Sequence, residues 1–206
     1  MQMATQGSGD CSPRHELDRL SQSSVIDAGP ATQGELAGLA AIAEREIPGV
    51  NASTELVQVL RADPESIFSF RRAGKLVGGI AFLYFNSTGH DALLRDTIDL
   101  KNPDRAYLAG PHENVAAIYV WALAGYGRAV MGLGSVAAHL RSPRFAEADY
   151  YARPSSKDGR ELLIALGFRP IPRFQPDLWC YQRLWHRQQG FPAFEHSIWS
   201  GIDARH

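Results

Sequence analysis

The fold is decided by the stretch Arg128-Ala129-Val130-Met131-Gly132-Leu133-Gly134. An apolar run at residues 115–123 precedes it and predicts a strand, and an apolar-periodic segment ending near Leu140 follows it and predicts a helix. The first N–H groups of a helix are unpaired and carry partial positive charge, so a glycine-spaced turn leading into a helix favours phosphate binding. The alternative is a plain helix whose small residues allow close packing, although each glycine costs such a helix about 1 kcal/mol. We therefore expect a phosphorylated cofactor at this turn.

Composition narrows the class of protein. The 206 residues are 45% hydrophobic and 21% charged with a net charge of −1, which is typical of a globular domain and gives no reason to expect nucleic-acid or membrane-surface partners. The apolar run at 115–127 is shorter than the roughly 18 residues of a membrane span, and the first residues lack the layout of a secretory signal, so a cytoplasmic location is expected. Cys11 and Cys180 share no ligand spacing, so no metal site is predicted.

Patterns along the chain predict one mixed α/β domain at residues 23–185, with a flexible arm at 1–22 and a tail at 186–206. The capping-box pattern Thr32-x-x-Glu35 opens a helix, and a second helix is expected at 54–61. The further expected elements are a strand at 25–28, a hairpin at 66–85, a long polar connection at 86–113 with a short helix within 91–100, strands at 148–152, 168–171 and 178–184, and a helix at 156–166. The predicted order is β-α-α-β-β-β-α-β-α-β-β.

This order resembles the GNAT N-acetyltransferase superfamily over roughly residues 24–184, and three stretches carry the resemblance. The hairpin segment Gly74-Lys75-Leu76-Val77-Gly78-Gly79 looks like the family's second and third strands. The turn resembles the family's Arg/Gln-x-x-Gly-x-Gly/Ala motif, with Ala129 in the basic or amide position and Arg128 one residue early. The third stretch runs from Tyr150 to the Leu166-Gly167-Phe168 ending. The resemblance implies an α+β mixed sheet with a GNAT-like acyl-CoA N-acyltransferase fold.

The resemblance further implies a site for acetyl-CoA or another acyl-CoA. Backbone groups of Leu123 and Ala124 would bind the pantetheine amides, and Ser156 aligns with an Asn that often contacts the cofactor arm. The pyrophosphate would lie against Arg128 and N–H groups between Ala129 and Ser135. The residues assigned to the cofactor in this way are Leu123, Ala124, Arg128, Ala129, Val130, Gly132, Leu133, Gly134, Ser135 and Ser156.

The catalytic groups depart from the family pattern. The position of the family's acidic Tyr holds Leu163, which cannot donate a proton, and residues 116–123 contain no carboxylate that could act as a base. The substitutes are Glu113 at the strand entrance, Tyr119 on the strand and Tyr126 beside the turn, each of which also has a purely structural interpretation.

Two functions follow from these residues. The first is transfer of an acetyl group from acetyl-CoA to the amine of a small molecule or peptide, by direct attack in a ternary complex; the acidic 86–113 connection would suit such an acceptor. The second is a catalytically weak or inactive GNAT-like module that binds CoA and regulates. The sequence leaves a homodimer open in both cases.

Overall fold

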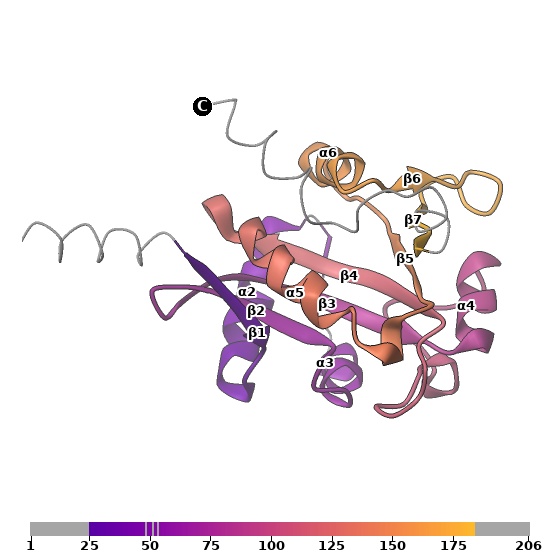
Figure 1. The fold of residues 1–206 in the computed structure, drawn as a ribbon, viewed down its shortest axis with the longest axis horizontal. Helices are drawn as coiled ribbons and strands as arrows, with labels where there is room; N and C mark the ends of the chain where they lie inside the picture. Colours follow the sequence, from indigo (N-terminus) through magenta and orange to yellow (C-terminus); the bar gives the residue numbers. More distant parts are fainter. Residues whose placement is uncertain (1–24, 48, 51, 53, 184–206) are drawn as a thin grey trace, which may run out of the picture.

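A single seven-stranded sheet organises the part of the chain that the computed structural model describes, namely residues 25–47, 49–50, 52 and 54–183 (Figure 1). The predicted arm at 1–22 and the tail at 186–206 lie outside these residues. The strand order is β1-β2-β3-β4-β5-β7-β6, and every neighbouring pair is antiparallel except β4 and β5. The strands are β1 (Ile26–Pro30), β2 (Ile67–Arg72), β3 (Lys75–Phe85), β4 (Ala117–Gly125), β5 (Asp149–Ala152), β6 (Arg169–Pro170) and β7 (Trp179–Tyr181).

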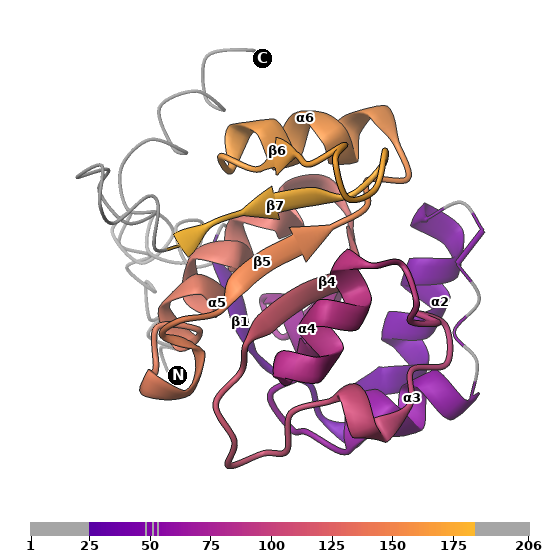
Figure 2. The ribbon, with the colours of Figure 1, turned by 90° about the vertical axis from the view of Figure 1, so that its right-hand side faces the viewer.

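Helices cover both faces of this sheet (Figures 1 and 2). One face packs against α2 (Leu36–Glu46), α3 (Thr54–Arg61) and α4 (Ser87–Leu94). The other face carries α5 (Leu133–His139), while α6 (Lys157–Ala165) packs over β5 and β7. Four short 3-10 helices complete the fold: η1 (Gln33–Glu35), η2 (Arg105–Tyr107), η3 (Gly127–Gly132) and η4 (Pro143–Phe145). No helix among the described residues has the length and apolarity to cross a membrane.

The start of the first helical segment forms as the capping box predicts. The backbone N–H of Thr32 donates to the Glu35 carboxylate at 2.8 Å, and the Thr32 side chain receives the reciprocal backbone bond. The same carboxylate accepts two bonds from Arg71 on β2, at 2.6 and 2.7 Å. Glu35 therefore both opens the helical segment and ties it to the sheet.

The connection at 86–113 differs from its prediction in where its helix lies. The helix begins at Ser87 because the Asn86 side chain accepts the Gly89 N–H at 2.9 Å, a cap that the apolar pattern alone does not reveal. It ends after Leu94, and Asp96 then adopts a positive φ of 56°, which breaks helical geometry. The predicted helix within 91–100 is therefore shifted toward the N-terminus.

Candidate active site

The chemistry-bearing part of the fold is the place where β4 and β5 separate. Strand β4 pairs with β3 along its whole length to Gly125, but it pairs with β5 only from Ala117 to Val120. Strand β5 ends at Ala152, and Pro154 follows two residues later, where it can neither donate a backbone hydrogen bond nor let its predecessor turn into a helix. Among the described strands, none consequently lies beside the open edge of the second half of β4.

A β-bulge lies at the start of this open edge. Phe82 pairs with Val120 and Ala81 pairs with Ala122, so Trp121 is the extra residue of β4. Beyond it, the Tyr126 N–H donates to the Val77 carbonyl at 2.8 Å.

Residues of an antiparallel strand alternate between bonding their partner strand and facing away from it. Counting back from the Tyr126 bond, Ala124 directs its backbone groups toward β3, whereas Leu123 and Gly125 direct theirs to the open edge.

A cleft of about 540 Å³ follows the open edge. Its walls are the C-terminal end of α2 with the residues after it, β4 from Val120 onward, the start of η3, the residues that follow β5, and the first turns of α6. Both faces of the sheet contribute to the lining, because Trp121 and Ala122 share the walls with Leu123 and Val130. The cleft therefore passes around the edge of β4 from one face of the sheet to the other.

The predicted cofactor residues divide into two groups at this cleft. Those that line it are Leu123, Ala124, Ala129, Val130 and Ser156. Those that do not line it are Arg128, Gly132, Leu133, Gly134 and Ser135.

The turn itself folds as the 3-10 helix η3, and this changes what its glycines do. The Ala129 N–H donates to the Tyr126 carbonyl at 3.1 Å, and the Leu133 N–H donates to the Val130 carbonyl. Both amides are thus engaged within the protein rather than directed at a ligand. Gly132 is buried, and a β-carbon there would stand 2.5 Å from the ring of Phe70. The glycine accordingly lets η3 approach the sheet, which is the packing alternative weighed from the sequence.

Packing also explains why Ala129 occupies the family's basic or amide position. Ala129 is only 1% exposed, and its β-carbon would stand 2.6 Å from a β-carbon at Gly125 and 3.2 Å from one at Gly78. A longer side chain has no room between η3 and these two strands. The exposed Arg128 next to it remains outside the cleft lining.

Two residues on the α6 side of the cleft bear on the predictions, namely Ser156, which the resemblance assigns to the cofactor, and Leu163, which stands in the position of the family's acidic Tyr. Ser156 is the N-cap of α6, and its hydroxyl accepts the Gly159 N–H at 3.0 Å while keeping its own proton for a ligand. Leu163 lines the cleft at 8% exposure. The position where a family member would hold an acidic phenol therefore presents hydrocarbon.

The three predicted catalytic residues all lie outside the cleft lining. Glu113 precedes β4, at the opposite end of the strand from the open edge, and its carboxylate accepts the Gly110 N–H at 2.8 Å. Tyr119 is 6% exposed among core residues, and burial raises the pKa of its phenol to about 12. Tyr126 is exposed, and its ring lies 4.3 Å from the guanidinium carbon of Arg45.

Three ionisable residues that the sequence did not single out line the cleft instead, namely Glu46, Arg153 and Asp158. The Arg153 guanidinium forms ion pairs with Asp96 at 2.8 Å and Asp177 at 3.5 Å, so its charge is compensated within the protein at the rim of the cleft. Glu46 is the last residue of α2 and contacts Arg45 at 3.1 Å. In the sequence, Pro48 and Gly49 end the predicted helix just after Glu46, and this pattern indicates that the Glu46 carboxylate lies at a helix end near a loop.

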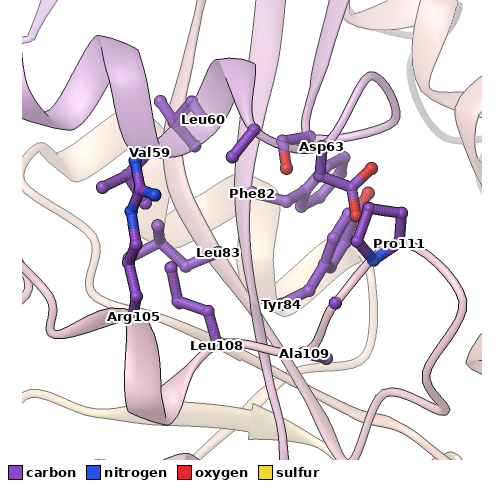
Figure 3. Close-up of a pocket in the computed structure, with 13 residues that line it drawn as sticks. Val59, Leu60, Asp63, Phe82, Leu83, Tyr84, Arg105, Leu108, Ala109 and Pro111 are labelled. Atoms are coloured by element: carbon purple, nitrogen blue, oxygen red, sulfur yellow. The ribbon is translucent and has the colours of Figure 1, made fainter.

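The 86–113 connection lines a separate pocket of about 160 Å³ (Figure 3). Arg105, Leu108, Ala109 and Pro111 line it together with residues of α3 and the buried Asp63, which lies beside Pro111 in Figure 3. None of the residues from 86 to 113 lines the cleft. Asp96, through its bond to Arg153, is the part of this connection that reaches the cleft rim.

Comparisons with known proteins place the fold. No protein-family model matches the sequence, and no curated protein is significantly similar to it. Among solved structures, the GNAT-like decarboxylase GphF in complex with isobutyryl-CoA matches 77% of this chain and 99% of its own, with a TM-score of 0.54 and 17% identity. The loading GNATL domain of CurA from Lyngbya majuscula matches with a TM-score of 0.51 and 12% identity, over 78% and 99% of the two chains. A GCN5-related N-acetyltransferase from Anabaena variabilis matches with a TM-score of 0.42 and 12% identity, over 67% of this chain and only 31% of that longer chain.

Proposed function

We propose that this chain, which has the GNAT fold, is an acyl-CoA-dependent acyltransferase whose co-substrate lies in the cleft along the open edge of β4. The observation that carries the proposal is the edge of β4 at Leu123 and Gly125, with which no described strand pairs, inside a cleft of about 540 Å³. Such an edge can bind the amide groups of an extended molecule as it would bind another strand. The complex of GphF with isobutyryl-CoA supports the choice of ligand class.

The direction of the bound molecule follows from the walls. Its phosphate end belongs where η3 begins, at Gly127 and Val130, beside the exposed Arg128. Successive residues of a strand advance by about 3.3 Å, so two pantetheine amides at Gly125 and Leu123 bring the thioester to the bulge at Trp121.

The residue best suited to prepare an acceptor is Glu46. Acyl transfer to an amine forms a C–N bond at the thioester carbonyl and breaks its C–S bond, and the nitrogen must lose a proton to a base or to water. Among the described residues that line the cleft, only Glu46 and Asp158 are carboxylates, and Asp158 lies in the first turn of α6. Glu46 lies on the α2 side, where an acceptor approaching Trp121 would pass. We assign it the role of base for an amine acceptor.

Binding of CoA is the first test. Isothermal titration of the full chain should show saturable binding of CoA, and Val130→Asp should weaken it at least about tenfold because a carboxylate would face the phosphates. Val130→Asn introduces a side chain of the same size as Asp but without its charge, and this variant should bind CoA with an affinity within about threefold of the wild type's. If CoA at millimolar concentration does not bind, or if both variants bind alike, the cofactor assignment is wrong.

A second candidate function is a CoA-binding module without turnover. It is favoured by Leu163, which gives the leaving thiolate no acid, and by the buried Tyr119, whose phenol lies outside the cleft. Thiol release measured over a panel of amines separates the two functions. Sustained release that falls at least about tenfold in Glu46→Gln supports transfer, whereas CoA binding with no release across the panel supports the module.

A further inference from the structure

An apolar pocket of about 60 Å³ adjoins the cleft where the thioester is expected. It lies between α2, α3 and the sheet, and all of its lining residues are apolar. Three of them, Trp121, Ala122 and Ala124, also line the cleft, so the two spaces share one wall. The pocket and the cleft are thus neighbours at the bulge of β4, and Trp121 lies between them.

Small residues on the sheet create this space. Gly79 and Ala81 on β3 stand next to Ala122 and Ala124 on β4, and together they leave room beneath α2. Gly79 could not be replaced by a larger residue, because a β-carbon there would stand 2.5 Å from the Phe68 carbonyl oxygen.

The apolar lining selects the kind of group that the pocket can hold. An amine acceptor would lose its hydrogen bonds to water there without gaining protein partners, and that loss is costly. A hydrocarbon chain gains free energy in the same place. The amine belongs at the cleft mouth beside Glu46, and the group that belongs in the pocket is the chain attached to the thioester.

We propose that this pocket receives the acyl group, so that the protein uses CoA thioesters of about four carbons in preference to acetyl-CoA, and that Trp121 sets the entrance of the pocket. The inference rests on the proposed function, because it needs the thioester at the bulge. A cavity of about 150 Å³ holds one benzene ring, so a space of about 60 Å³ holds about two methylene-sized groups beyond those at the entrance. Each methylene buried in it should tighten binding up to about fourfold.

The test compares the affinities of CoA, acetyl-CoA, butyryl-CoA, hexanoyl-CoA and decanoyl-CoA by titration with the full chain. Butyryl-CoA should bind about tenfold more tightly than acetyl-CoA because it buries two more methylene groups, and decanoyl-CoA should lose this advantage because its end has no room. If affinity does not change with chain length while CoA itself binds, the acyl pocket is refuted and the proposed function stands. If CoA does not bind, the proposed function itself fails.

A filled-pocket variant makes the test independent of the cleft. Ala40 lines the apolar pocket and does not line the cleft. Ala40→Leu should reduce the preference for butyryl-CoA over acetyl-CoA to less than about threefold and leave CoA affinity unchanged. Ala37→Leu makes the same change at an exposed position of α2 and should retain the preference. A preference that survives in a folded Ala40→Leu protein would overturn the assignment.

Enlargement of the entrance gives the opposite change. Trp121→Ala removes an indole that lines both spaces. The preferred acyl group should then lengthen from butyryl toward hexanoyl. An optimum that stays at butyryl in the folded variant would refute the role of Trp121.

Discussion

Replacement of Gly132 by Ala tests whether this glycine serves packing or phosphate binding. Its backbone is right-handed helical, with φ −64° and ψ −17°, so alanine is conformationally permitted and on propensity alone would stabilise the helix by about 0.5–1 kcal/mol. The added β-carbon would stand 2.5, 2.9 and 3.0 Å from three atoms of the Phe70 ring. That ring is 0% exposed, so it cannot give way by turning into solvent without rearranging the core around it. Overpacking of this kind costs about 1–3 kcal/mol, so we expect a net destabilisation of about 1–2 kcal/mol.

Thermal unfolding provides the assay. For a domain of this size the loss corresponds to a fall in Tm of about 2–8 °C. Gly134→Ala is the matched control, because Gly134 is exposed on α5 and the same change there should leave Tm equal or higher. CoA affinity measured at 20 °C should be unchanged within about twofold in both variants.

A double-mutant cycle identifies the contact. In a Phe70→Leu background the added methyl of Gly132→Ala should cost at least about 0.5 kcal/mol less, because the ring that it meets is gone. A Gly132→Ala protein of wild-type Tm that no longer binds CoA would refute the packing argument and restore the phosphate role.

Two further predictions concern charged groups in the fold. Arg144→Met should lower the free energy of unfolding in urea by about 3–5 kcal/mol, because the Asp63 side chain is only 10% exposed and loses its ion-pair partner at 2.5 Å. As a control, Arg95→Ala at an exposed ion pair should change the free energy of unfolding by less than about 0.5 kcal/mol. Equal effects of the two substitutions would contradict this account. Arg71 lowers the pKa of Glu35 from 4.5 to about 2, so this pair stabilises the fold fully above pH 4.5, and the contribution is lost as pH falls from about 4.5 to about 2. In Arg71→Met the free energy of unfolding should therefore lose this dependence on pH between about 4.5 and about 2. If the free energy of unfolding of Arg71→Met varies between pH 5 and pH 2 as it does in the wild type, the assigned role of the pair is wrong.

Several elements could be predicted from the sequence because their causes are local. Helix α3 (Thr54–Arg61) lies where the apolar spacing predicts it, and the hairpin of β2 and β3 follows its alternating pattern. Glu35 forms the predicted capping box. The mixed α/β class and the GNAT fold expected from the ordered motifs are both confirmed, although the predicted order lacks the helix α4 that lies between β3 and β4. The helix after Asn86 shows the limit, because its start depends on one side-chain cap rather than on a period.

The candidate site was predictable only in part. Leu123, Val130 and Ser156, which the resemblance assigns to the cofactor, line the cleft, whereas Glu113 and the turn glycines do not. Glu113 fails because it lies at the opposite end of β4 from the open edge. The sequence motif places Glu113 before the strand, but only the pairing of β4 with β5 shows where along β4 the open edge begins.

The sequence by itself determined most of the strands and helices, the capping of the first helical segment, and the presence of a strand before and a helix after the turn that contains Arg128. These depend on neighbours within a few residues. Only the tertiary structure decided what the turn does, because the role of Gly132 depends on Phe70, a side chain from a strand far away in the chain. It also decided where ligands can bind, since the separation of β4 from β5 and the arrival of Glu46 from α2 both depend on contacts between distant segments.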